Sequence, residues 1–201
     1  MAMTTLTRDR LRRAGLGAFF RPHELEVLGI DYEGLRSLVR GGTVERVARG
    51  LYRFADAEPT EHYSLAAVCA RVPDSIVCLL SALRVHEIGT RVPAEVWLAI
   101  PHKARPPRIR GTKIRLVRFS GAAWRYGVVP MEFEGVRARI TNPARTVLDC
   151  FRFERLVGRE ASIEALRDAL RQKKVTTDAL YRTLEALPSR RLRAVLEAMT
   201  S

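Results

Sequence analysis

Apolar residues recur at helical spacing in three short stretches near the start of the chain. Leu6 and Leu11 share one face of a predicted first helix over residues 5–14. A second, short helix begins at Pro22, where the missing N–H costs nothing, and ends at Gly29. The chain is therefore expected to open as a small helical unit.

The third stretch carries the clearest helix signals. Asp31 is a good N-cap for it, and the pair Gly41-Gly42 supplies the stop. Its inward face is predicted to consist of Leu35, Leu38 and Val39. Its outward, polar face carries Glu33, Arg36, Ser37 and Arg40.

Two β-prone runs follow the third helix, at residues 43–47 and 51–54, and a turn containing Gly50 joins them. This pattern predicts a hairpin. Its tip and edges carry Arg46, Arg49 and Arg53. Three short helices followed by such a hairpin are typical of a winged helix-turn-helix.

In a winged helix-turn-helix the recognition helix enters the major groove and the wing lies over phosphates. Arg36 and Arg40 lie one turn apart, and arginine bound to guanine through two hydrogen bonds is the commonest specific contact. We therefore predict DNA contacts from Glu33, Arg36, Ser37 and Arg40 on the helix and from Arg46, Arg49 and Arg53 on the wing. The alternative is a protein-interaction module of the same shape, whose arginines are ordinary surface charges.

Beyond residue 60 the pattern changes to a mixture of strands and helices. Helices are predicted over residues 62–72, 75–86, 161–172, 178–187 and 190–199, and strands over residues 95–100, 113–119, 131–133 and 136–140. A further helix starts at Asn142-Pro143, with Asn142 as its cap, and Arg145 can pair with Asp149 one turn later. The predicted fold class is α+β, with a winged helix-turn-helix domain over residues 1–57 and a mixed α/β domain over residues 60–201 that ends in helices.

Charge is distributed unevenly along the chain. The 35 Lys and Arg exceed the 22 Asp and Glu, giving a net charge of +13, which favours a polyanionic partner. Residues 1–60 carry a net charge of only +2, whereas residues 84–145 carry +9. The densest basic stretch, residues 103–118, begins as a loop because prolines and a glycine interrupt it.

This basic loop is predicted to contact the DNA backbone, although a solvated loop without a partner is the alternative. The backbone contacts that we expect come from Lys103, Arg105, Arg108, Arg110 and Lys113 in the loop and from Arg12 and Arg13 on the first helix.

Composition excludes several other classes of protein. At 47% hydrophobic and 28% charged residues the chain is expected to fold rather than to stay disordered. No apolar run approaches the roughly 18 residues of a membrane span and no secretory core follows the N-terminus, so a cytoplasmic location is expected. Cys69, Cys78 and Cys150 are far apart in apolar stretches, which indicates core thiols rather than disulfides or a zinc site.

No pattern of catalytic residues is apparent. None of the four lysines has an acidic residue two positions before it, and no two aspartates are separated by one residue, so the metal-binding patterns of common nucleases and nucleotidyltransferases are absent. A phosphate-binding glycine pattern is also missing. Ser81 and His86 lie five residues apart on one predicted helix without a nucleophile elbow, which is a weak hydrolase signal. We therefore predict no enzymatic activity, catalytic residue, metal or cofactor.

Six segments of the chain resemble the AbiEi family of antitoxins in their order and spacing. They are GGTVERVARGLYR at residues 41–53, CLLSAL at 78–83 with His86, EVWLAIP at 95–101, VRFSGAA at 117–123, TNPARTVLDCF at 141–151 and EALRDALRQ at 164–172. The resemblance spans roughly residues 5–199.

The resemblance implies a bacterial, cytoplasmic type IV antitoxin, active as a monomer or weak dimer. Its winged helix would bind inverted repeats in its own promoter and repress the operon. Its C-terminal domain would counter a nucleotidyltransferase toxin, without a stable complex, in a system tied to abortive phage infection. The residues alone leave open a basic RNA-binding or protein-interaction module without sequence-specific DNA readout.

Overall fold

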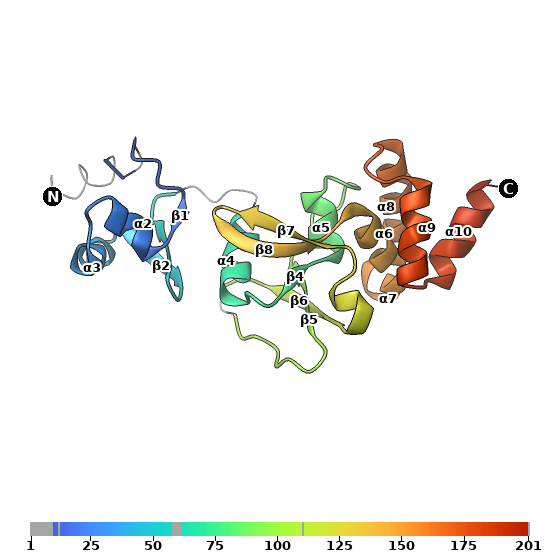
Figure 1. The fold of residues 1–201 in the computed structure, drawn as a ribbon, viewed down its shortest axis with the longest axis horizontal. Helices are drawn as coiled ribbons and strands as arrows, with labels where there is room; N and C mark the ends of the chain where they lie inside the picture. Colours follow the sequence, from blue (N-terminus) through green and yellow to red (C-terminus); the bar gives the residue numbers. More distant parts are fainter. Residues whose placement is uncertain (1–9, 12, 58–61, 110, 201) are drawn as a thin grey trace. The chain divides into compact units, whose positions relative to one another are not determined.

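The computed structural model describes residues 10–11, 13–57, 62–109 and 111–200 (Figure 1). The chain packs as two compact units, one of residues 1–73 and 132–138 and the other of residues 74–131 and 139–201. The domain boundary predicted at residues 57–60 lies partly outside the described residues and stays a prediction.

The first unit contains the predicted helix-turn-helix. Of the first predicted helix, Arg10, Leu11 and Arg13 are described and helical. Helix α2 spans Pro22–Val27 and helix α3 spans Tyr32–Arg40. The turn between α2 and α3 contains Gly29 at φ +78°, a backbone conformation that favours glycine.

A three-stranded antiparallel sheet completes the winged unit. Its strands are β1 (Phe19–Phe20), β2 (Val44–Ala48) and β3 (Leu51–Phe54), in the order β1-β3-β2. Strands β2 and β3 form the predicted hairpin, whereas β1 was not predicted because two residues are too few to show an alternating pattern. Strand β1 forms because it pairs with β3 and buries both of its phenylalanine rings.

The winged unit has its own hydrophobic core. Residues of the first helix, α2, α3 and the sheet supply it: Leu11, Phe20, Leu25, Leu35, Leu38, Val44 and Phe54. Val39 was predicted to face inward but is 37% exposed, because it lies about 100° around the helix from Leu38. Helix α4 (Tyr63–Arg71) belongs to the same unit, and the ring of Tyr63 lies 5.5 Å from that of Phe19.

The second sheet has five strands in the order β6-β5-β4-β8-β7. They are β4 (Ile76–Val77), β5 (Val96–Pro101), β6 (Ile114–Phe119), β7 (Val128–Phe133) and β8 (Val136–Thr141). Strand β4 pairs antiparallel with β5 and parallel with β8, and β5 pairs parallel with β6, so the sheet is mixed.

Strand β4 corrects one prediction. Residues 75–86 were expected to form one helix, but the chain is extended at Ile76 and Val77 and becomes helical only at Leu79, where α5 (Leu79–Val85) begins. The two β-branched residues are fully buried between β5 and β8, so tertiary pairing overrides the local helical pattern.

Helices dominate the end of the chain, as predicted, and Figure 1 shows α6 to α10 gathered into one group. They are α6 (Pro143–Arg152), α7 (Glu154–Val157), α8 (Arg159–Arg171), α9 (Thr177–Ala186) and α10 (Arg190–Thr200), and a 3₁₀ turn, η1 (Gly121–Trp124), precedes β7. Together the two sheets and the helices confirm the α+β fold class.

A fully buried ion pair joins α6 to the loop before β7. Asn142 caps α6 as predicted, accepting from the N–H of Arg145 at 2.9 Å. The predicted partner of Arg145 is also found, with Nε 2.8 Å from a carboxylate oxygen of Asp149, and both side chains are 0% exposed. The same guanidinium donates to the carbonyls of Tyr126 (2.7 Å) and Ala123 (3.1 Å), so it fixes helix, loop and 3₁₀ turn together.

Candidate nucleic-acid interface

The N-cap and the buried apolar residues of α3 determine which of its residues face outward. The carboxylate of Asp31 accepts from the N–H of Gly34 at 2.8 Å and caps the helix, while Leu35 and Leu38 are buried. Gly34 allows close packing, because a Cβ at this position would lie 2.7 Å from Cγ2 of Ile30. The polar residues of α3 therefore point away from the core.

All four predicted contact residues of α3, namely Glu33, Arg36, Ser37 and Arg40, are exposed. Glu33 is ion-paired with both arginines. One carboxylate oxygen lies 2.9 Å from Arg40 and the other lies 3.6 Å from Arg36. This arrangement holds the two guanidinium groups on one side of the helix, beside the hydroxyl-bearing Ser37.

The wing presents two of its three predicted arginines to solvent. Arg46 is exposed and its Nε donates to the carbonyl of Ala48 at 3.3 Å, across a register shift in the β2–β3 pairing. Arg49 is exposed at the turn next to Gly50, whose φ is +67°. No partner for the side chain of Arg49 is found among the described residues.

Arg53 departs from the expectation of a solvent-facing wing residue, since it is only 8% exposed. Its guanidinium bonds to Glu45 at 2.8 Å and to the carbonyls of Phe54 and Ala57, and it lies 4.7 Å from the ring centroid of Tyr63. Position 53 points inward because the sheet is covered there by α4. The geometry therefore makes Arg53 a residue that ties the wing to α4.

The basic loop runs between β5 and β6. Its predicted contact residues Lys103, Arg105, Arg108 and Lys113 are all exposed, and the structure gives their side chains no partner among the described residues. Arg13 is likewise exposed, whereas the predicted contacts Arg12 and Arg110 lie outside the described residues.

Arg118, which the sequence places in the same basic stretch, has a different role. One nitrogen of its guanidinium donates to the carbonyls of Pro101 (3.2 Å), His102 and Ala104 (3.0 Å). These carbonyls form the start of the basic loop, so Arg118 holds that end of the loop against β6. The sequence shows only that Arg118 is basic. The direction of its side chain in the structure shows that it clamps the start of the basic loop by bonding to these carbonyls.

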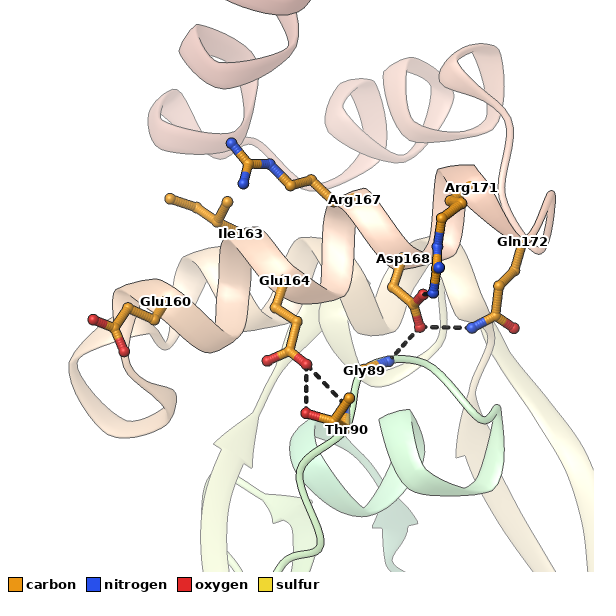
Figure 2. Close-up of a pocket in the computed structure, with 9 residues that line it drawn as sticks. All are labelled: Gly89, Thr90, Glu160, Ile163, Glu164, Arg167, Asp168, Arg171 and Gln172. Atoms are coloured by element: carbon orange, nitrogen blue, oxygen red, sulfur yellow. Dashed lines mark hydrogen bonds and ion pairs between the residues drawn. The ribbon is translucent and has the colours of Figure 1, made fainter.

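A pocket of about 680 Å³ lies beside α8 (Figure 2). Its carboxylates already have partners, because Glu164 accepts from the N–H of Thr90 at 2.9 Å and Asp168 from that of Gly89 at 2.7 Å. The guanidinium of Arg171 holds the pKa of Asp168 below its usual value. The pocket is therefore the place where the loop after α5 is fastened to α8.

The residues of the weak hydrolase signal are engaged in structural contacts. The hydroxyl of Ser81 accepts from the N–H of Trp97 at 2.9 Å, and Nε2 of His86 lies 2.7 Å from the carbonyl oxygen of Thr141. Burial raises the pKa of the Cys69 thiol to about 12, and Cys78 and Cys150 are also buried and unpaired. In the part of the chain that the structure describes, no three His, Cys, Asp or Glu side chains gather as metal ligands. No described helix combines the length and apolarity of a membrane span.

Comparisons with known proteins agree with this architecture. Over 92% of its length the chain is similar to the crystal structure of the RV2827C protein from Mycobacterium tuberculosis, covering 72% of that chain with 15% sequence identity and a TM-score of 0.60. At this identity the likeness concerns the fold alone. No curated protein matches the chain. Residues 9–55 match a family model described as "Transcriptional regulator, AbiEi antitoxin". This match covers the helix-turn-helix and the wing, which are therefore similar to the AbiEi family of transcriptional regulators and antitoxins.

Proposed function

We propose that this chain is a sequence-specific DNA-binding repressor of its own operon and the antitoxin of a bacterial type IV toxin–antitoxin system. The observation that carries the proposal is the outward face of α3, where Arg36 and Arg40 are exposed one turn apart. Both are long enough to reach base edges in a major groove, and each offers the two donors that match guanine.

The wing and the basic loop are proposed to supply backbone contacts. Arg46 and Arg49 would lie over phosphates beside the recognition helix. Lys103, Arg105, Arg108 and Lys113 have the exposure that phosphate binding needs, and Arg13 would add to them. Arg12 and Arg110 stay in the proposal on the sequence alone, and Arg53 is proposed to position the wing.

A gel-shift titration tests the DNA-reading role. The probes are a duplex covering the region upstream of the chain's own gene and a scrambled duplex of equal length. Arg36→Ala and Arg40→Ala should each weaken binding to the promoter duplex by about 1–3 kcal/mol and leave the scrambled duplex nearly unaffected. Arg71→Ala, an exposed arginine at the end of α4, is the control. Equal affinity of the wild type for both duplexes would reject specific readout and favour the RNA-binding or interaction alternative.

The basic loop is tested through the salt dependence of binding. Lys103→Ala with Arg105→Ala should lower affinity for both duplexes alike, and should reduce the slope of log affinity against log salt by about 0.9 for each phosphate that is no longer neutralised. Arg167→Ala with Arg182→Ala removes the same charge from the exposed faces of α8 and α9 as the control. An unchanged slope in the loop variant rejects its contact with the backbone.

The antitoxin role requires a partner toxin, which we propose to be a nucleotidyltransferase encoded by the neighbouring gene. Co-expression with this chain should restore growth that the toxin alone arrests. The two proteins are expected to elute separately in gel filtration, since no stable complex is proposed. The chain itself is proposed to be a cytoplasmic monomer or weak dimer, to need no metal or cofactor, and to have no enzymatic activity. Failure to restore growth would overturn the antitoxin role.

A further inference from the structure

Tyr32 is an aromatic residue exposed at the start of the proposed recognition helix. It is the first residue of α3, and it is 64% exposed. Within the part of the chain that the structure describes, no hydrogen bond or ring contact engages its side chain. The cap of α3 comes from Asp31, so Tyr32 does not supply it. The contacts that form the fold therefore do not account for this aromatic side chain.

Single exposed apolar residues are common on protein surfaces, so the position of Tyr32 decides what it can do. Tyr32 and Arg36 are four residues apart on α3, which makes them neighbours about 40° apart around the helix axis. Side chains of a helix lean toward its N-terminus, so the ring lies toward the end of α3 that precedes Arg36. In helix-turn-helix proteins the N-terminal residues of the recognition helix contact base edges. The ring is therefore placed to meet a base close to the one that Arg36 would read.

We propose that Tyr32 is a specificity-determining residue whose ring packs against the 5-methyl group of a thymine in the operator. This proposal rests on the proposed DNA-reading function of α3. It adds an apolar contact with one base to the hydrogen bonds proposed for Arg36 and Arg40.

The physical argument compares the groups that the four bases present in the major groove. Thymine presents an apolar methyl group there, whereas the other three bases are recognised by their hydrogen-bond donors and acceptors. An aromatic ring would shield those polar atoms from water without bonding to them, which is unfavourable. Burial of one methyl group is favourable and corresponds to about 4-fold in affinity. The contact therefore favours thymine within the bound complex itself.

Deoxyuridine tests this contact because it differs from thymidine only by the missing methyl group. The probes are the promoter duplex and the same duplex with deoxyuridine at every thymidine, compared by gel-shift titration. The wild type should bind the deoxyuridine duplex at least about 4-fold more weakly. Tyr32→Ala should bind the thymidine duplex at least about 4-fold more weakly than the wild type does. Its further loss on the deoxyuridine duplex should be smaller than that of the wild type by about 4-fold, because ring and methyl group act as one pair.

Two variants and one duplex serve as controls. Tyr32→Phe keeps the ring and removes the hydroxyl, so it should respond to deoxyuridine as the wild type does. Val92→Ala removes a 75% exposed apolar side chain outside the winged unit and should bind both promoter duplexes like the wild type. The scrambled duplex, made with either base, measures any general effect of deoxyuridine. Tyr32→Ala should bind the scrambled duplex with nearly wild-type affinity, because phosphate contacts dominate there.

Three results overturn the proposal. Tyr32→Ala could respond to deoxyuridine as strongly as the wild type, or the wild type could prefer the promoter to the scrambled duplex and yet not respond to deoxyuridine. In the third, Tyr32→Phe could lose affinity as Tyr32→Ala does, which would assign the contact to the hydroxyl and a phosphate. A wild-type chain that binds promoter and scrambled duplexes equally is a different failure. It rejects the proposed function itself, and it is recognised with unmodified DNA before any variant is made.

Discussion

Replacing Arg145 with methionine should destabilise the protein strongly. The guanidinium is fully buried, bonds to Asp149 and to two backbone carbonyls, and lies 4.8 Å from the ring centroid of Phe119. Its loss leaves the Asp149 carboxylate buried beside Arg152 alone, which lies 3.5 Å away and is 31% exposed. Removing one partner of a buried pair costs about 3–5 kcal/mol. Because Arg152 compensates in part, we expect about 3 kcal/mol, or a fall in Tm of about 6–12 °C.

The loss of stability in Arg145→Met should depend on pH in a defined direction. Burial raises the pKa of Asp149 to about 6, above the value of about 3.9 in an unfolded chain. The folded state therefore takes up this proton more readily, and the contribution of Asp149 to stability falls as pH rises from about 4 through about 6. Without Arg145 the pKa rises further. The difference in the free energy of unfolding between wild type and Arg145→Met should thus be larger at about pH 7.5 than at about pH 5.

Urea unfolding followed by circular dichroism measures both effects. Arg145→Met with Asp149→Leu should be more stable than either single variant, since neither charge is then left alone in the interior. Arg137→Met, at an exposed arginine, should change stability by less than about 0.5 kcal/mol and serves as the control. Three results would refute the reasoning. Arg145→Met could lose less than about 1 kcal/mol of stability, its loss of stability could be independent of pH, or the double variant could be less stable than both single variants.

Three further outcomes are expected. Arg118→Ala should release the start of the basic loop and reduce the salt slope of DNA binding as the loop variants do, whereas Arg115→Ala, whose partner is Glu95, should do so less. Gly34→Ala should cost about 1–3 kcal/mol in urea unfolding, because the new Cβ would lie 2.7 Å from an atom of Ile30. Burial lowers the pKa of His86 below 6.5, so its contribution to stability is complete above that pH and is lost as pH falls further. His86→Gln should remove this part of the acid sensitivity, and an unchanged pH profile would contradict it.

Much of the architecture follows from local signals in the sequence. The caps at Asp31 and Asn142, the stop at Gly41-Gly42 and the turn at Gly50 are chemical requirements of single turns of chain, so they can be recognised without the fold. The pairing of Arg145 with Asp149 is local in the same sense, because residues four apart share one helix face.

Other features depend on neighbours that are distant in sequence. The two-residue strands β1 and β4 exist because they pair with strands that are distant in sequence. A stretch of two residues is too short for its sequence pattern to predict such pairing. The inward direction of Arg53 depends on α4, and the clamp of Arg118 depends on where the carbonyls of residues 101–104 lie.

The sequence by itself determined that the polar residues of α3 are exposed, since a capped helix with one apolar face leaves its polar face outside. It also determined that Glu33 lies within reach of Arg36, three residues away. Only the tertiary structure decided that Arg53 is buried and that Arg145 is fully enclosed. The physical reason is that helix spacing fixes which residues are neighbours, whereas burial and the choice of partner depend on chain segments that meet only after folding.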